Sequence, residues 1–368
     1  MINKMKDNNL INGENLETLK NILPKIEKKV SIIYIDPPYN TGKKMGKYND
    51  SWATKELYID FLKERLDIAK KTLKPGGIIF VSIGERMQSR VKNLLEDIFK
   101  EKNHVASIIW KNKYTVSNDK IGITGQNEYI FAYTNDIRKI NINNDPLRKE
   151  YIKTAYKHKD EKTGELYRLG VQMWKSKNPE TSRYDVVSPT GVVWNEKWNF
   201  KESSFKDLDD NGIVYWGENN DKCPTKKVYL KNTKGRGINN IWHGEDVGYT
   251  SDGTAQLKSI LGISGEFLYP KPVQLIKRIL EITYNKETKD DLVLDFFAGS
   301  GTTGQAVLEF NNENKTNLRF LLITNNEDNI CESITLPRIE SIYNGYKDSK
   351  NGIMVDSIGD KGKFNYIE

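Results

Sequence analysis

Residues 30–39 read VSIIYIDPPY, an apolar run of strand length that ends in Asp36-Pro37-Pro38-Tyr39. The two prolines fix the backbone dihedral φ and remove two N–H donors, so the loop is stiff and presents carbonyl oxygens together with one carboxylate. A loop of this kind is suited to accept hydrogen bonds from an NH₂ group. The alternative interpretation is a plain proline turn with a solvated Asp36.

The segments that follow alternate between helical and strand patterns. Residues 57–73 carry apolar side chains at helical spacing, KPGG at 74–77 stops that helix, and residues 78–83 (IIFVSI) form a second apolar strand. The other elements of this part are expected at residues 87–99 (helix), 105–110 and 128–133 (strands). Strands that alternate with helices predict an α/β fold with a parallel, doubly wound sheet.

A second loop at a strand end lies near the other end of the chain. Residues 291–297 (DLVLDFF) are strand-like and lead into AGSGTT at 298–303, before a helical pattern. Gly299 and Gly301 allow backbone N–H groups to approach a ligand at the start of that helix. The pattern differs from G-x-G-x-x-G, and no lysine follows as in a phosphate-binding loop. It therefore suits the carboxylate and neutral nucleoside of S-adenosylmethionine, with Phe297 against the cofactor; a glycine turn without a ligand is the alternative.

Together the two loops indicate methyl transfer to an exocyclic amine. The lone pair of adenine N6 is delocalised into the ring and is a poor nucleophile. If the Asp36 carboxylate and the Pro37 carbonyl accept its two hydrogens, the nitrogen can pyramidalise and attack a methyl sulfonium. Tyr39 offers a flat face for a base that has left the stack, which chemistry on a duplex base requires.

The composition fits a globular protein that binds nucleic acid. The chain has 368 residues, 37% hydrophobic and 29% charged, with a net charge of +7, and a basic protein gains sequence-independent affinity from phosphates. The two cysteines and three histidines show no ligand spacing, so neither a disulfide nor a metal site is expected. No apolar run reaches the roughly 20 residues of a spanning helix, and no signal peptide is evident. We therefore expect a soluble, cytoplasmic protein without a membrane partner.

Between about residues 135 and 265 the periodic pattern breaks down, which predicts a separate, irregular module. Aromatic side chains amid basic ones can stack on bases and contact phosphates. For any single residue a core position or a solvated face is the favoured interpretation, whereas for the whole module we favour DNA recognition. The aromatic and basic residues are Trp174, Trp194, Trp198, Trp216, Trp242, Arg183, Lys226, Lys227, Lys231, Lys234 and Arg236.

Residues 111–127 (KNKYTVSNDKIGITGQN) form a polar, glycine-containing loop after a strand near the predicted site. One interpretation is a loop that closes over a flipped base, with Tyr114 as an insertable side chain. An ordinary surface loop is equally compatible with this sequence.

The chain resembles the β-class amino-methyltransferases of restriction–modification systems, particularly the modification subunits of type III systems and their shorter relatives. The resemblance covers both ends of the chain. Its supporting strings are NGENLETLK, IYIDPPYNTG, LYIDFLKERLDIAKKTLKPGGIIFVSI, NEYIFAYTN, YPKPVQLIKRIL and LVLDFFAGSGTTGQAVLEFN. In that class the catalytic loop precedes the cofactor loop and the target-recognition region lies between them, which is the order found here.

The resemblance assigns roles to individual residues. The catalytic motif corresponds to Asp36, Pro37, Pro38 and Tyr39. The cofactor loop corresponds to Asp295, Phe296, Phe297, Ala298, Gly299, Ser300, Gly301, Thr302 and Thr303, of which the two threonines are candidates to bind the methionyl carboxylate. The Lys-Pro pair that opens the cofactor-packing helix corresponds to Lys271 and Pro272.

At three places the chain departs from the family pattern. Glu14 and Asn15 stand in a Gly-Glu-Asn where Gly-Asp-Asn is frequent, and Glu14 can still accept from a cofactor amine. Asn127-Glu128-Tyr129 replaces a frequent His-Glu-Tyr, which leaves the role of this loop in base packing open. After the strand at 318–323, Asn326 or Glu327 is the candidate for the ribose hydroxyls, with a solvated turn as the alternative.

The resemblance implies a Rossmann-like, circularly permuted methyltransferase sheet with helices on both faces and an inserted recognition module. The expected divisions are 1–134 (catalytic half), 135–265 (target recognition), 266–346 (cofactor-binding half) and 347–368 (C-terminal tail). The implied activity is methylation of adenine N6 in double-stranded DNA with S-adenosylmethionine and no metal, in a bacterium or a phage. A homodimer and a cognate restriction endonuclease subunit remain open as partners.

Other activities stay as alternatives. Cytosine-N4 methylation uses the same amine chemistry, but relatives with Ser-Pro-Pro-Tyr are commonly the cytosine enzymes, so Asp36 favours adenine. Methylation of RNA or of a protein amide is disfavoured by the large middle module and the permuted order of the motifs. An inactive DNA-binding relative is disfavoured because both loops are intact.

Overall fold

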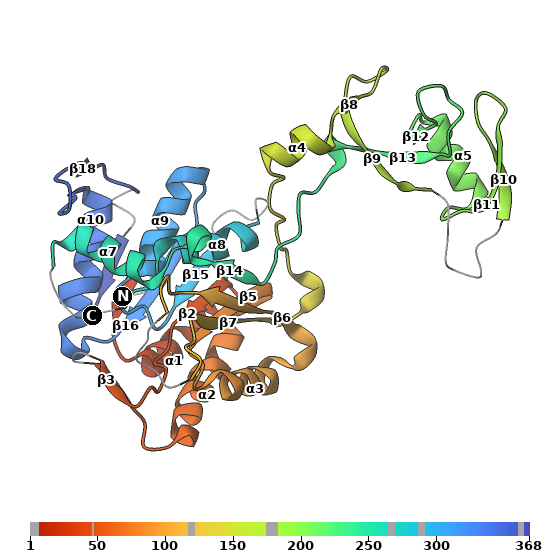
Figure 1. Cartoon of the computed structure of the whole chain (residues 1–368). Coiled ribbons are helices and arrows are strands. Elements are labelled where there is room, and N and C mark those ends of the chain that lie inside the picture. Colours follow the sequence, from red (N-terminus) through yellow and green to blue (C-terminus); the bar gives the residue numbers. More distant parts are fainter. Residues whose placement is uncertain are drawn as a thin grey trace. The chain divides into compact units, whose positions relative to one another are not determined.

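The computed structural model describes residues 7–45, 48–116, 122–173, 183–263, 269–285, 291–359 and 364–368 (Figure 1). The chain forms two compact units. The first combines Met1–Asn143 with Ile238–Glu368, and the second is the intervening segment Asn144–Gly237. The first unit is therefore assembled from both ends of the chain.

The first unit is built on a sheet whose central strand, β2 (Val30–Ile35), is buried along its whole length. Among the described residues, nine strands form this sheet in the order β14-β6-β7-β5-β2-β15-β16-β1-β19. Their bounds are β1 (Asn8–Asn12), β5 (Leu73–Ile83), β6 (His104–Lys111), β7 (Asn127–Thr134), β14 (Ile241–His243), β15 (Leu292–Asp295), β16 (Arg319–Thr324) and β19 (Phe364–Ile367). Continuously apolar strands such as β2 are typical of parallel sheets that are covered on both faces.

Strand β7 is the exception to the parallel arrangement that the sequence predicts. It runs antiparallel to both β5 and β6, while the other neighbouring pairs of the sheet are parallel. β6 and β7 follow one another in the chain and are joined by residues 112–126, and the described part of this connection, 112–116 and 122–126, contains no helix. Because consecutive strands without a crossover pair as antiparallel neighbours, the short connection explains the reversal.

Helices cover both faces of the sheet, which confirms the predicted doubly wound architecture. Ile33 and Ile35 of β2 point into one core, and Ile32 and Tyr34 point into the other. One face is covered by α1 (Asn15–Ile26), α2 (Lys55–Thr72) and α3 (Gln88–Phe99), and the other by α7 (Thr250–Leu261), α8 (Val273–Thr283), α9 (Thr302–Asn314) and α10 (Leu336–Asn344) (Figure 1). The shorter elements are β3 (Lys43–Met45), β4 (Tyr48–Asp50), α6 (Gly244–Val247), β17 (Tyr346–Lys347), β18 (Met354–Val355), the 3-10 turns Glu101–Asn103, Ile137–Lys139 and Glu327–Asn329, and the π-helical turn Cys331–Thr335.

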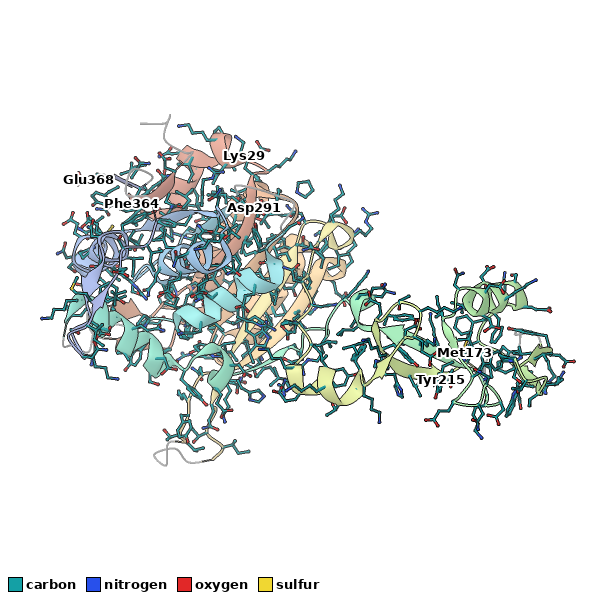
Figure 2. The ribbon with its side chains drawn as sticks, turned by 90° about the horizontal axis from the view of Figure 1, so that it is seen from above. Lys29, Met173, Tyr215, Asp291, Phe364 and Glu368 are labelled. Atoms are coloured by element: carbon teal, nitrogen blue, oxygen red, sulfur yellow. The ribbon has the colours of Figure 1, made fainter. Side chains whose placement is uncertain are left out.

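The C-terminal segment adds an edge strand that the sequence pattern does not reveal. β19 pairs in parallel with β1, and Phe364 and Glu368 lie together at one side of the first unit (Figure 2). The ring of Phe364 packs at 5.4 Å from that of Tyr343 and at 6.2 Å from that of Phe320. The residues expected as a tail therefore contribute to the main sheet.

The second unit has a small core of its own, near which Met173 and Tyr215 are labelled in Figure 2. Its described strands form a four-stranded sheet in the order β12-β13-β9-β8 and the hairpin β10–β11. The bounds are α4 (Lys149–Ala155), β8 (His158–Lys159), β9 (Leu166–Gln172), β10 (Arg183–Val187), β11 (Val193–Lys197), α5 (Glu202–Asp210), β12 (Val214–Tyr215), β13 (Thr225–Tyr229) and the 3-10 turn Leu230–Asn232. The unit is narrower than the module expected at 135–265, since residues 238–263 lie with the first unit.

Several tryptophans of the middle region are core residues. Trp198 and Trp216 are buried in the second unit, and Trp242 is buried in the first. For these three tryptophans this confirms the core position that the sequence analysis favours, while Trp174 lies outside the described residues. In the described part of the chain, none of the helices combines the length and the hydropathy needed to cross a membrane.

Candidate active site

The two loops singled out in the sequence meet at one edge of the main sheet. β2 and β15 are adjacent and parallel, with Ile33 opposite Leu294, so Asp36 and Asp295 leave the sheet at the same edge. In the main sheet, the strand that follows β2 in the chain is β5, and it lies on the side of β2 away from β15. The strand that follows β15 is β16, and it lies on the side of β15 away from β2. Ligands of open α/β sheets bind at such a switch point, beyond the carboxyl ends of the strands.

Asp36 lies in a cluster of charged and polar side chains. The Lys271 ammonium donates to Asp36 Oδ2 at 2.8 Å and to the Tyr39 hydroxyl at 2.9 Å, and it lies 3.3 Å from Glu128 Oε2. The Tyr39 hydroxyl is 2.9 Å from Asp36 Oδ1 and 2.8 Å from Glu128 Oε2. Asn112 donates to Glu128 Oε1 at 2.7 Å. These five residues are called the Asp36 cluster below.

The charges of the Asp36 cluster are strongly coupled. Burial disfavours the Lys271 ammonium, but the carboxylates of Asp36 and Glu128 outweigh this and raise the pKa of Lys271 above its ordinary value. Loss of hydration raises the pKa of Asp36, the ammonium of Lys271 lowers it, and the charge of Glu128 raises it again, so the pKa stays above its ordinary value. Burial also raises the pKa of Tyr39 well above its usual range. The cluster therefore holds one cation against two carboxyl groups, with Tyr39 as a neutral donor.

The loop that carries Asp36 and Tyr39 is held in place by its neighbours. The Tyr58 hydroxyl donates to the Pro38 carbonyl at 2.6 Å. The buried Asp50 carboxylate accepts from the backbone amides of Asn40 and Thr41 at 2.7 and 2.9 Å. A Cβ atom at Gly84 would lie 2.9 Å from the Tyr39 ring, so only glycine allows this close approach. The stiffness expected from the two prolines is thus reinforced by packing.

The second loop is a tight turn before α9. The Asp295 side chain, 3% exposed, accepts from the Thr303 hydroxyl at 2.5 Å and from the Phe297 backbone amide at 3.0 Å. Its burial raises the pKa of Asp295 to about 7. Gly301 adopts a left-handed φ of 79° and its amide donates to the Ala298 carbonyl at 2.8 Å. This geometry presents the positive end of α9 at the edge of the sheet.

Arg338 supports this turn from within the protein. It is fully buried, and its Nη1 donates to the Ser300 carbonyl at 3.1 Å, the Ser300 hydroxyl at 3.0 Å and the Thr302 hydroxyl at 2.9 Å. Its Nε donates to Gln305 at 2.8 Å, and Nη2 has no hydrogen-bond partner in the described part of the chain. Burial lowers the pKa of Arg338 to about 10. Sequence reasoning missed this residue, since nothing local distinguishes it from a surface arginine of α10.

Of the predicted cofactor residues Glu14 and Asn15, Asn15 lies against the second loop. Asn15 donates to the Phe296 carbonyl at 2.8 Å. Arg65 of α2 donates to Asn15 at 2.5 Å and forms an ion pair with Glu14, which also caps α1. The guanidinium of Arg65 lies 3.7 Å above the centre of the Phe61 ring. The sequence places Arg65 on the helical stripe of α2 but gives no sign of this bridging role.

A half-buried aromatic surface lies beside these residues. The ring of Phe61 packs at 6.0 Å from that of Phe297 and at 5.2 Å from that of Trp52. All three side chains are only partly buried. Flat apolar faces of this kind can pack against a nucleoside.

The remaining predicted residues occupy less central positions. Pro272 precedes α8 directly and so fixes Lys271 at the start of that helix. At the end of β16, Asn326 bonds with Asn329 and with the Glu332 backbone amide, both at 3.2 Å, while Glu327 is exposed. The binding roles of Pro272, Asn326 and Glu327, like the catalytic and binding roles predicted for the two loops, stay predictions. The described residues contain no group of three His, Cys, Asp or Glu side chains that could hold a metal ion.

Comparison with known proteins gives consistent matches. The model of a family described as DNA methylase matches residues 30–336. The StyLTI Mod subunit, a type III restriction-modification enzyme of Salmonella typhimurium, is 31% identical, over 88% of this chain and 53% of its own length. The EcoP15I Mod subunit of Escherichia coli is 28% identical, over 87% of this chain and 59% of its own length. The chain thus spans little more than half the length of these relatives. Among solved structures, PvuII DNA methyltransferase (cytosine-N4-specific) matches with a TM-score of 0.45 and 14% identity, over 87% of this chain and 82% of that one.

Proposed function

The chain belongs to the DNA methylase family, and from this premise we propose that it transfers a methyl group from S-adenosylmethionine to N6 of an adenine flipped out of double-stranded DNA. The observation that carries the proposal is that two groups of residues meet at the switch point between β2 and β15. These are the Asp36 cluster, whose carboxylate and proline loop accept hydrogen bonds, and the Asp295 turn at the start of α9.

The residues at the second loop fit S-adenosylmethionine, which when bound supplies an activated methyl group. The start of α9 favours a carboxylate, and Glu14 offers an acceptor for an ammonium group. The aromatic surface of Trp52, Phe61 and Phe297 is suited to the apolar parts of the cofactor. Thr302 and Thr303 already bond inside the protein, so the backbone amides before α9 are the better candidates for the carboxylate.

The Asp36 cluster activates the amine of the base. The carboxylate of Asp36 and the carbonyl of Pro37 accept the two N6 hydrogens, which localises the lone pair on nitrogen. Bound S-adenosylmethionine would supply its methyl group to this nitrogen and leave as S-adenosylhomocysteine, and Asp36 would take the surplus proton. Burial raises the pKa of Asp36, and the ammonium of Lys271 lowers it, so Lys271 favours the ionised form of this carboxyl group in a poorly hydrated pocket. The hydroxyl of Tyr39 bonds to the same carboxyl group and fixes its orientation.

The second unit is proposed to recognise the DNA, together with flanking residues of the segment 135–265. Its described surface carries basic side chains, including Lys226, Lys231 and Arg236, that suit phosphate groups. Within this proposal, residues 1–134 and 266–346 supply catalysis and cofactor binding. The relatives are named as Mod subunits of restriction-modification enzymes, so we place this chain in bacterial DNA modification in the cytoplasm, with a restriction subunit and a second copy as candidate partners.

A nucleoside analysis tests the proposal. The protein is incubated with plasmid DNA and labelled S-adenosylmethionine, and the DNA is digested and analysed by mass spectrometry. We expect label in N6-methyladenine, and Asp36→Ala should reduce transfer by about 10²-fold or more while cofactor binding persists. The exposed Asp67→Ala is the matched control. Label in N4-methylcytosine, in RNA or in protein would contradict the proposal, as would near-native turnover by Asp36→Ala.

A further inference from the structure

The loop between β6 and β7 begins inside the wall of the Asp36 cluster. Asn112, 4% exposed, receives a backbone hydrogen bond at 3.0 Å from Thr250 and donates its own amide to the Gln126 carbonyl at 3.0 Å. Its side chain donates to Glu128 at 2.7 Å. The base of this loop is therefore fixed to the residues that surround Asp36.

Beyond this base the loop exposes large apolar side chains. Tyr114 is 74% exposed, Val116 is 57% exposed and Ile123 is fully exposed. Single exposed apolar residues are ordinary on protein surfaces, but several on one loop beside a reaction site mark an interaction surface. Among the described residues, the ring contact of Tyr114 is an edge contact, at 5.7 Å, with the ring of Tyr249.

The charge of this loop and its distance from the Asp36 cluster indicate that a DNA duplex contacts the exposed side chains. Lys113, next to Tyr114, is exposed and suited to a phosphate. Tyr114 follows Asn112 by two residues, so its Cα lies within about 7 Å of that of Asn112. A duplex that delivers a base to the Asp36 cluster must pass close to this loop. An apolar side chain at that place can fill the gap that the extruded base leaves, as wedges do between base pairs elsewhere.

We propose that Tyr114 is a wedge that enters the DNA duplex at the position of the extruded base, with Val116 and Ile123 against the neighbouring bases. This inference rests on the proposed function, since it requires a base taken from a duplex. Tyr114 holds no reacting atom and touches none of the catalytic side chains in the described structure. Its contribution is to stabilise the open duplex, so its loss affects only substrates whose target base is paired.

Two duplexes test the wedge, both containing the sequence that the native protein methylates. In one the target adenine is paired, and in the other it faces an abasic position. Tyr114→Ala is expected to lower kcat/KM at least about tenfold on the paired duplex and about twofold or less on the abasic one. Tyr114→Trp should retain activity on both, and Met354→Ala, which removes an exposed apolar side chain of β18 in the first unit, serves as the matched control.

The outcomes separate the wedge from the proposed function. Equal losses on the two duplexes, or no loss on the paired one, would overturn the wedge while the native protein remains a DNA methyltransferase. Strong fluorescence of 2-aminopurine at the target position with the native protein, and a weaker signal with Tyr114→Ala, would support it. A native protein that methylates neither duplex would refute the proposed function and the wedge together.

Discussion

Replacing Lys271 by methionine removes the only ammonium within ion-pair distance of Asp36 among the described residues. The side chain of Lys271 is 8% exposed and that of Asp36 is 28% exposed, so water screens their interaction only in part. The substitution leaves Asp36 and Glu128 facing each other with no cation between them. Methionine keeps most of the side-chain volume, so the packing at the start of α8 should survive.

The expected cost follows from this burial. Removing one partner of a buried ion pair costs about 3–5 kcal/mol, and the partial exposure of Asp36 favours the lower end of that range. If this free energy destabilises the ionised form of Asp36, which accepts one amine hydrogen, about 3 kcal/mol corresponds to a decrease in kcat/KM of about 10²-fold. Lys271 lowers the pKa of Asp36, so its removal raises that pKa further. A protonated Asp36 cannot take up the surplus proton of the amine. As the solution is acidified, Lys271→Met should therefore lose activity at a higher pH than the native protein.

The assay is the initial rate of methyl transfer to DNA, measured from acidic to weakly basic pH for native protein and Lys271→Met. The matched control is Lys277→Met, because Lys277 lies on α8, which Lys271 shortly precedes, but pairs with Glu313 and Glu309. The acid limb of the Lys271→Met profile should move to higher pH, and that of the control should not. An unchanged acid limb, or an equal loss in both variants, would refute the assigned role of Lys271.

Three further predictions concern single residues of the site. Glu128→Gln removes the anion that raises the pKa of Asp36, so the acid limb of kcat/KM should move to lower pH, opposite to Lys271→Met; a shift to higher pH would contradict this. Burial raises the pKa of Asp295 from 3.8 to about 7, so the native state holds a proton that unfolding releases and stability falls as pH rises through this range. The melting temperature of Asp295→Asn relative to native protein should therefore increase from pH 4 to pH 7, and a constant difference would refute the account. Arg338→Lys cannot reproduce the fork of bonds to the second loop, so calorimetry should show S-adenosylhomocysteine binding weakened about tenfold or more, whereas an unchanged Kd would show that the loop needs no such support.

The elements that follow from short-range patterns could be predicted from the sequence. The apolar run at 30–35 and the proline and glycine loops at its end and at 298–303 are local signals, because strand periodicity and backbone restriction depend on neighbouring residues. Parallel strands covered by helices then bring such loops to one edge of the sheet. That Asp36 and Asp295 leave the sheet at the same edge follows from this rule, whereas the neighbourhood of β2 and β15 is a property of the strand order.

The contacts that complete the site are not visible in the sequence, because they join residues that only the fold brings together. Lys271 was expected to open a cofactor-packing helix, yet 235 positions separate it from Asp36, to which it donates. Glu128 reaches the same cluster because β7 is antiparallel and lies beside β5. Arg338 is a buried cation, and burial of an arginine cannot be read from its neighbours in α10. Strand β19 is too short for its sequence pattern to predict it, and it is recognised by its pairing with β1.

The most direct measurement is a crystal structure of the protein with S-adenosylhomocysteine and a DNA duplex that contains the methylated sequence. The sulfur atom is expected at the switch point between β2 and β15, above the Asp295 turn, with the target base amine against Asp36 and Pro37. A sulfur atom bound elsewhere, with no common cavity joining it to Asp36, would contradict the account of this site.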